Sequence, residues 1–122
     1  MTETSREDFK ILQEIAMAAN DKKAKRVTAM NLKNISDLCD YAFICSGDNS
    51  TQTQAIANAV QEVLKAKFDM IPKIVEGADE GHWILIDYGY IIVHIFYDYI
   101  RNYYGLERLW TDAVFMNLSK SE

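Results

Sequence analysis

The pattern of hydrophobic and polar positions is most regular over residues 82–96, where two runs rich in β-branched and aromatic residues flank Tyr88-Gly89. Such runs favour β-strands, and a glycine at the second central position of a two-residue loop suits the positive φ that hairpin turns require. The pattern therefore predicts a β-hairpin in which Asp87 pairs with Tyr90.

The predicted pairing, with Trp83 opposite His94, gives the hairpin two faces of different chemistry, because side chains alternate between faces along a strand. One face carries aliphatic residues suited to burial under a helix: Ile84, Ile86, Ile91, Val93 and Ile95, with His82 at its open end. The other, called the mixed face below, combines rings with polar groups: Trp83, Leu85, Asp87, Tyr90, Ile92, His94 and Phe96. The mixed face suits contact with a partner, or equally packing under another helix of the same domain.

Two helices are predicted before the hairpin. A capping box at Thr4-Ser5-Arg6-Glu7 precedes an apolar stripe that ends near Asn20: Phe9, Leu12, Ile15, Ala16 and Ala19. A loop and N-cap over 46–51 precede a second stripe: Ala55, Ile56, Ala59, Val60, Val63 and Leu64.

Strands are predicted at 27–32, 41–45 and 73–77 in addition to the hairpin, and a last helical turn at 106–110. The order αββαβββα implies an α/β fold, with a mixed β-sheet of about five strands flanked by helices. We expect one domain over residues 1–122, with a loose tail at 116–122.

Charge is unevenly distributed along the chain. The formal net charge is -5, and residues 69–122 alone carry a net -5. An acidic surface repels phosphate backbones, so we expect little direct contact with nucleic acid and allow a basic protein partner. The basic run 21–26 is typical of a solvated loop, and a weak phosphate contact there is the less favoured interpretation.

The cysteines and the N-terminus indicate a cellular compartment. Cys39 and Cys45 lie along one predicted extended segment, too far apart to form a disulfide. The N-terminus lacks the pattern of a secretion signal, and no apolar run approaches the length of a membrane span. We therefore expect a cytoplasmic protein with reduced cysteines and no membrane contact.

No arrangement typical of catalysis stands out in the sequence. His82 and His94 are predicted on opposite faces of the hairpin, so they cannot bind one metal ion. A metal-dependent nucleotidyl transfer site would need paired acids after a Gly-Ser turn, whereas Asp37 and Asp40 precede the turn at 46–47. We predict a protein that is not an enzyme and that uses no metal or cofactor.

Several motifs occur in order along the chain: Asp40-Tyr41, Ser46-Gly47, Glu76-Gly77, 83–89, 93–96, Arg101 and 104–110. Together they resemble the ribosomal silencing factor family, also called Iojap, over roughly residues 7–113. The resemblance implies a small α/β domain similar to nucleotidyltransferase folds, without that activity. It also implies a translation repressor that binds the large ribosomal subunit through ribosomal protein L-fourteen and blocks joining of the small subunit when nutrients run short.

The resemblance further implies a set of partner-binding residues: Trp83, Leu85, Asp87, Tyr88 and His94, with Arg101, Tyr104 and Glu107 nearby. Most of the first group belongs to the mixed face. Arg26 and Tyr90 depart from the family, which usually has acids at these positions. Two alternative functions are a magnesium-dependent nucleotidyltransferase-like enzyme and a dimeric scaffold that uses the Trp83 face on itself. A homodimer is also compatible with ribosome binding.

Overall fold

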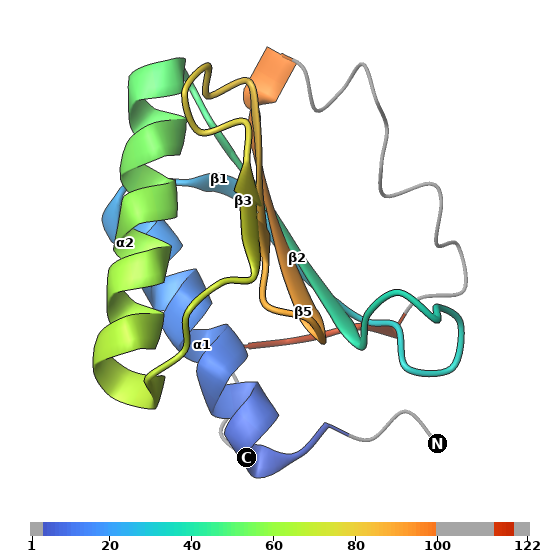
Figure 1. Cartoon of the computed structure of the whole chain (residues 1–122). Coiled ribbons are helices and arrows are strands. Elements are labelled where there is room, and N and C mark those ends of the chain that lie inside the picture. The colour runs from blue at the N-terminus through green and yellow to red at the C-terminus, as the bar shows by residue number, and fades with distance from the viewer. Residues whose placement is uncertain (1–3, 100–113, 119–122) are drawn as a thin grey trace.

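The computed structural model describes residues 4–99 and 114–118, which form a β-sheet with two helices packed on one of its faces (Figure 1). In chain order the elements are α1 (Arg6–Asp21), β1 (Lys25–Asn31), β2 (Tyr41–Gly47), α2 (Ser50–Phe68), β3 (Ile74–Glu76), β4 (Trp83–Asp87), β5 (Ile91–Tyr97) and β6 (Val114–Phe115). The predicted helical turn at 106–110 lies outside the described residues. The α/β class and the mixed sheet are confirmed.

Each helix begins at a polar side chain that caps a free backbone amide. Ser5 Oγ accepts a hydrogen bond from the Asp8 amide at 3.0 Å, one residue later than the predicted capping box. Asn49 Oδ1 accepts one from the Gln52 amide at 2.8 Å. All five predicted positions of the α1 stripe are buried. The α2 stripe is rotated from the prediction, because its buried side consists of Thr53, Ile56, Ala57, Val60 and Leu64.

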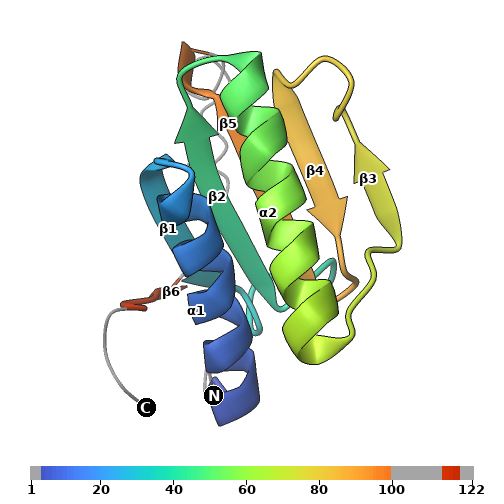
Figure 2. The ribbon, with the colours of Figure 1, turned by 90° about the vertical axis from the view of Figure 1, so that its left-hand side faces the viewer.

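The strands lie in the order β3-β4-β5-β2-β1-β6 (Figure 2). β2 and β5 pair in parallel at the centre, and the other neighbours are antiparallel. The sixth strand, β6, was not predicted. It pairs with β1, and beyond it the Met116 amide donates to the Ala29 carbonyl at 2.9 Å while the Leu118 carbonyl accepts from Gln13 Nε2 at 2.8 Å. Residues 116–118 are therefore tied to β1 and α1, in contrast to the loose tail expected there.

The β4–β5 hairpin forms as predicted, but with a different register. Asp87 pairs with Ile92, and the Tyr88 amide donates to the Ile91 carbonyl at 2.9 Å, so the two-residue loop is Gly89-Tyr90. Gly89 has φ 95° at the first central position of this loop, as in a type II′ turn. The pairing is displaced by two residues, an even number, and the strands therefore keep the predicted faces.

The core has two layers, one on each face of the sheet. Helices α1 and α2 cover the first layer, which includes every aliphatic residue predicted for the helix side of the hairpin: Ile84, Ile86, Ile91, Val93 and Ile95. The second layer lies on the opposite face and was not predicted: Met30, Leu32, Cys39, Ala42, Ile44 and Phe96. Strand β2 contributes to both layers and is buried along its whole length. Its uninterrupted apolar run is explained by this position at the centre of the sheet.

Candidate partner-binding face

The mixed face of the hairpin lies on the side of the sheet away from α1 and α2, and its burial is graded. Trp83, Leu85, Asp87 and Ile92 are partly exposed. His94 retains only 6% exposure and Phe96 none. The face is thus part surface and part core, and neither of the two interpretations given by the sequence describes all of it.

Trp83 is in contact with both Phe96 and His94 in the part of the chain that the structure describes. Its ring stacks on Phe96, its cross-strand partner, with centroids 4.9 Å apart and planes at 29°. Its Nε1 donates a hydrogen bond to His94 Nδ1 at 3.2 Å. A large amphipathic ring that is fixed and partly exposed is typical of the anchors of protein interfaces.

His94 is neutral in the folded protein at physiological pH. Burial lowers its pKa from 6.5 to about 4, because the charged imidazole would lose its hydration. Since the indole nitrogen can only donate, Nδ1 must be the accepting nitrogen and the ring proton lies on Nε2. Protonation of Nδ1 would place two donors face to face and break this hydrogen bond.

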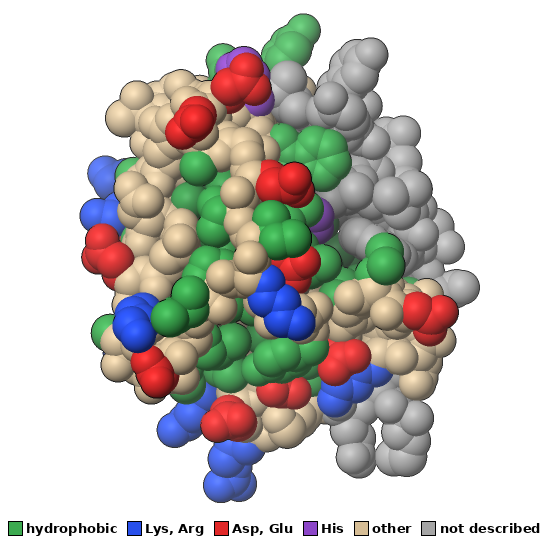
Figure 3. Space-filling model, viewed as in Figure 1, with side chains coloured by type: hydrophobic (Ala, Val, Ile, Leu, Met, Phe, Trp, Pro, Cys, Tyr) green, Lys and Arg blue, Asp and Glu red, His purple; other side chains and the backbone are tan. Residues whose placement is uncertain are grey.

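Asp87 combines a structural contact with a partly exposed charge. Its Oδ1 accepts a hydrogen bond from the Gly89 amide at 2.7 Å, which ties the carboxylate to the turn. On the neighbouring edge strand β3, Ile74 pairs with Asp87 and Glu76 pairs with Leu85. The side chains of Ile74 and Glu76 therefore extend the mixed face to the edge of the sheet. Figure 3 views the molecule from this edge and shows hydrophobic and charged side chains interspersed.

Sequence reasoning missed two exposed apolar residues beside this face. Ile74 is 51% exposed, and Leu38 in the β1–β2 loop is 80% exposed. The neighbouring Cys39 thiol has a raised pKa, mainly through burial and partly through the nearby carboxylates of Asp40 and Asp87. The β1–β2 loop therefore approaches the Asp87 end of the mixed face. The sequence did contain a signal for Leu38. Two apolar residues, Leu38 and Cys39, are adjacent in a predicted polar turn, and only Cys39 enters the core.

Tyr88 and Tyr90 lie on the helix side and not with the mixed face. Tyr88 is 6% exposed and belongs to the helix-side core, where burial raises its pKa to about 12. Tyr90 occupies the turn, so strand alternation does not apply to it, and its ring meets Tyr41 edge-on with centroids 6.5 Å apart. The placement of Tyr90 on the mixed face was wrong. Arg101, Tyr104 and Glu107 lie outside the described residues.

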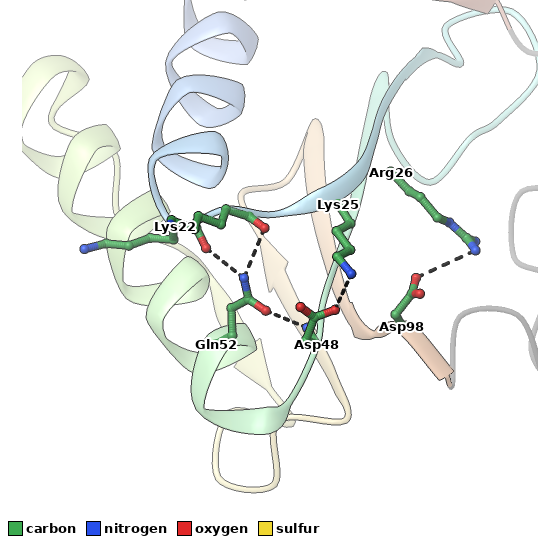
Figure 4. A network of polar contacts seen from close by, with 7 residues as sticks. Lys22, Lys25, Arg26, Asp48, Gln52 and Asp98 are labelled. Carbon is green, nitrogen blue, oxygen red and sulfur yellow. Dashed lines mark hydrogen bonds and ion pairs between the residues drawn. The ribbon is translucent and has the colours of Figure 1, made fainter.

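The basic run after α1 is partly neutralised within the molecule (Figure 4). Lys25 Nζ lies 2.6 Å from an oxygen of Asp48, and an Arg26 guanidinium nitrogen lies 3.7 Å from one of Asp98. Gln52 Nε2 donates to the carbonyls of Lys22 and Lys23 at 2.9 and 3.1 Å, which joins this loop to the first turn of α2. Two of the four cations therefore have carboxylate partners, which favours the solvated-loop interpretation over a phosphate contact.

Other chemistry is sparse in the part of the chain that the structure describes. No three His, Cys, Asp or Glu side chains there come together in a way that could hold a metal ion. Cys39 and Cys45 are both buried free thiols. None of the described helices has the length and apolar character needed to cross a membrane.

The fold defines a small α/β protein, and its mixed face is a partly exposed surface whose central indole has fixed neighbours. Comparison with known proteins gives the family. A family model described as "Ribosomal silencing factor during starvation" matches residues 2–122, and the chain belongs to this family. Its members, as the name states, are ribosome-associated regulators of translation.

Individual relatives agree with this assignment. Proteins named ribosomal silencing factor RsfS from Halalkalibacterium halodurans and Bacillus subtilis are 42% and 39% identical, over 84% and 88% of this chain and 87% and 91% of theirs. A crystal structure of a Chromobacterium violaceum protein superposes with a TM-score of 0.80 at 29% identity, covering 88% of this chain and 87% of that one. A mouse protein named "Mitochondrial assembly of ribosomal large subunit protein 1" is 29% identical over 70% of this chain and 43% of its own length.

Proposed function

We propose that this protein represses translation by binding the large ribosomal subunit through ribosomal protein L-fourteen, and that it sterically blocks association with the small subunit. No turnover is needed for such a mechanism. The proposal rests on family membership, and the name of the mouse relative, which refers to the large subunit, supports the choice of subunit. The proposed site of action is the cytoplasm.

The observation that carries the proposal is the construction of the mixed face. Trp83 is immobilised by Phe96 and His94 before any partner arrives, which lowers the entropy cost of binding. Leu85, two residues further along β4, and Ile92, opposite Asp87, add partly exposed apolar surface to the same face, and Asp87 adds a negative charge. A half-buried aromatic anchor with an acidic neighbour suits a basic protein partner, because the charges attract while the ring excludes water.

We assign the partner contacts to Trp83, Leu85 and Asp87 and extend them to Ile74 and Leu38. Arg101, Tyr104 and Glu107 remain part of the proposed surface on the strength of the family resemblance. Tyr88 is retained as a residue that supports the turn from inside the core, since little of it is accessible to a partner.

Co-sedimentation tests the proposal directly. Labelled protein is run on density gradients with isolated large subunits, isolated small subunits and joined ribosomes. We expect it to migrate with large subunits only, to prevent joining when added to separated subunits, and to be relieved by extra small subunits. A stoichiometric signal on joined ribosomes, with joining unaffected, would refute the exclusion mechanism. Binding of purified L-fourteen to the immobilised protein tests the choice of partner.

A further inference from the structure

His94 lies at the centre of the mixed face, yet it is nearly inaccessible. On β5 it pairs with Leu85 of β4 on one side and with Ile44 of β2 on the other. Only 6% of it is exposed. A partner that covers the mixed face would therefore meet Trp83 and Leu85 and touch little of the imidazole.

The imidazole instead acts on the indole of Trp83. Stacking on Phe96 restricts the plane of the indole but leaves the ring free to present either edge. The hydrogen bond from Trp83 Nε1 to His94 Nδ1 selects one edge, because the indole has a single donor. The two contacts together fix both the plane and the edge of the ring.

We propose that His94 is a positioning residue, whose Nδ1 fixes the orientation in which Trp83 is presented to the partner. The first alternative is that His94 is a core residue that contributes only to folding stability. A second alternative is direct contact between His94 and the partner. The inference depends on the proposed function for the identity of the partner, but the state of the indole can be measured in the free protein.

Two substitutions separate the acceptor from the ring. His94→Phe keeps an aromatic ring beside Phe96 and removes the acceptor. His94→Asn removes the ring but places Oδ1 close to the position of Nδ1. The indole proton of Trp83 is followed by NMR, and its signal is identified because Trp83→Phe deletes it. We expect fast exchange of this proton with solvent in His94→Phe, and protection close to that of the unsubstituted protein in His94→Asn. Equal protection in both variants would overturn the proposal.

Affinity for isolated large subunits supplies the second readout. We expect His94→Phe to bind about threefold to tenfold more weakly, the cost of immobilising one side chain at an interface, and His94→Asn to recover most of the loss. In a Trp83→Ala background His94→Phe should have no further effect, because there is no indole left to orient. An equal loss in both backgrounds would indicate direct contact with the partner and contradict positioning.

Two controls keep the outcomes separate. If His94→Phe does not fold, His94→Leu removes the same acceptor with a smaller side chain and is judged by the same indole signal. If the unsubstituted protein fails to bind large subunits while protection of the indole still follows the acceptor at position 94, the proposed function is refuted and the orienting role of His94 on the indole stands.

Discussion

The two faces of the β4–β5 hairpin differ in how completely they are buried, although the same backbone builds both. On the helix side Ile84, Ile86 and Val93 are fully buried under α1 and α2. On the mixed face burial falls from Phe96, which is fully buried, to Trp83 and Asp87, which are partly exposed. The same backbone thus builds a complete core on one face and a partial core on the other, where two buried rings, His94 and Phe96, contact the partly exposed ring of Trp83.

The largest expected effect is a loss of folding stability at acidic pH, caused by His94 on the mixed face. Since the folded pKa of His94 is about 4 and the ordinary value is 6.5, the unfolded chain binds more protons between these pH values. The stability that depends on neutral His94 is present above about pH 6.5 and lost as the pH falls towards 4, by roughly 3 kcal/mol. Urea denaturation near pH 7 and near pH 4 measures it.

Two histidine variants, one on each face of the hairpin, serve as test and control for this experiment. His94→Asn should lose the additional acid sensitivity, whereas His82→Asn, at the exposed end of the helix side, should keep it. If the stability difference between the unsubstituted protein and His94→Asn were the same at both pH values, buried His94 would not be the cause.

Trp83→Ala should affect binding more than folding. Truncation of an aromatic anchor near an interface centre costs about 2 kcal/mol or more, so affinity for large subunits should fall roughly 30-fold. Some loss of stability is also expected, because the indole packs on Phe96. Titration of labelled protein with large subunits provides the measurement, and unchanged affinity would remove Trp83 from the interface.

Val93→Ala is the counterpart on the helix side. Val93 is fully buried, so its truncation should lower the free energy of unfolding by roughly 1–3 kcal/mol. The fraction that remains folded should bind large subunits with unchanged affinity. A variant that lost binding at an unchanged melting temperature would reverse the assignment of the two faces.

Asp87→Asn should give the smallest effect, confined to the salt dependence of binding. Asparagine keeps an oxygen that can accept from the Gly89 amide, so the turn is preserved while the charge is removed. Added salt should weaken binding of the unsubstituted protein and weaken that of Asp87→Asn less. Parallel affinity curves against salt concentration for the two proteins would show that the carboxylate does not act through its charge.

The face assignment could be predicted from the sequence because it depends only on alternation. A two-residue error in register left it intact. Tyr88 belonged to the predicted turn, so alternation assigned it to no face, and its place in the helix-side core was not predicted. The turn itself was ambiguous, since Gly89 suits the second position of one two-residue loop and the first position of another.

The second core layer was harder to predict. In β2 apolar residues follow one another without a polar break, so the pattern identifies a central strand without saying what lies over each face. β6 has only two residues, too few for any periodic signal. The hydrogen bond between Trp83 and His94 was not predicted, although the predicted register set these residues opposite each other. In the structure they are diagonal neighbours, because Trp83 pairs with Phe96 and His94 with Leu85.

The parallel pairing of β2 with β5 has a consequence for the order of folding. Partners such as Tyr41 and Ile91 are joined across fifty residues of chain, whereas β4 and β5 are joined by a two-residue turn. A hairpin closes in about 1–10 µs, but long-range parallel pairing carries a much larger loop-closure entropy and is slower. The hairpin should therefore form before it pairs with β2. Ala42 and Ile44 of β2 then complete the layer around Phe96. Until that strand docks, the indole of Trp83 has no rigid layer beneath it, so the proposed binding surface should form only after β2 has joined the hairpin.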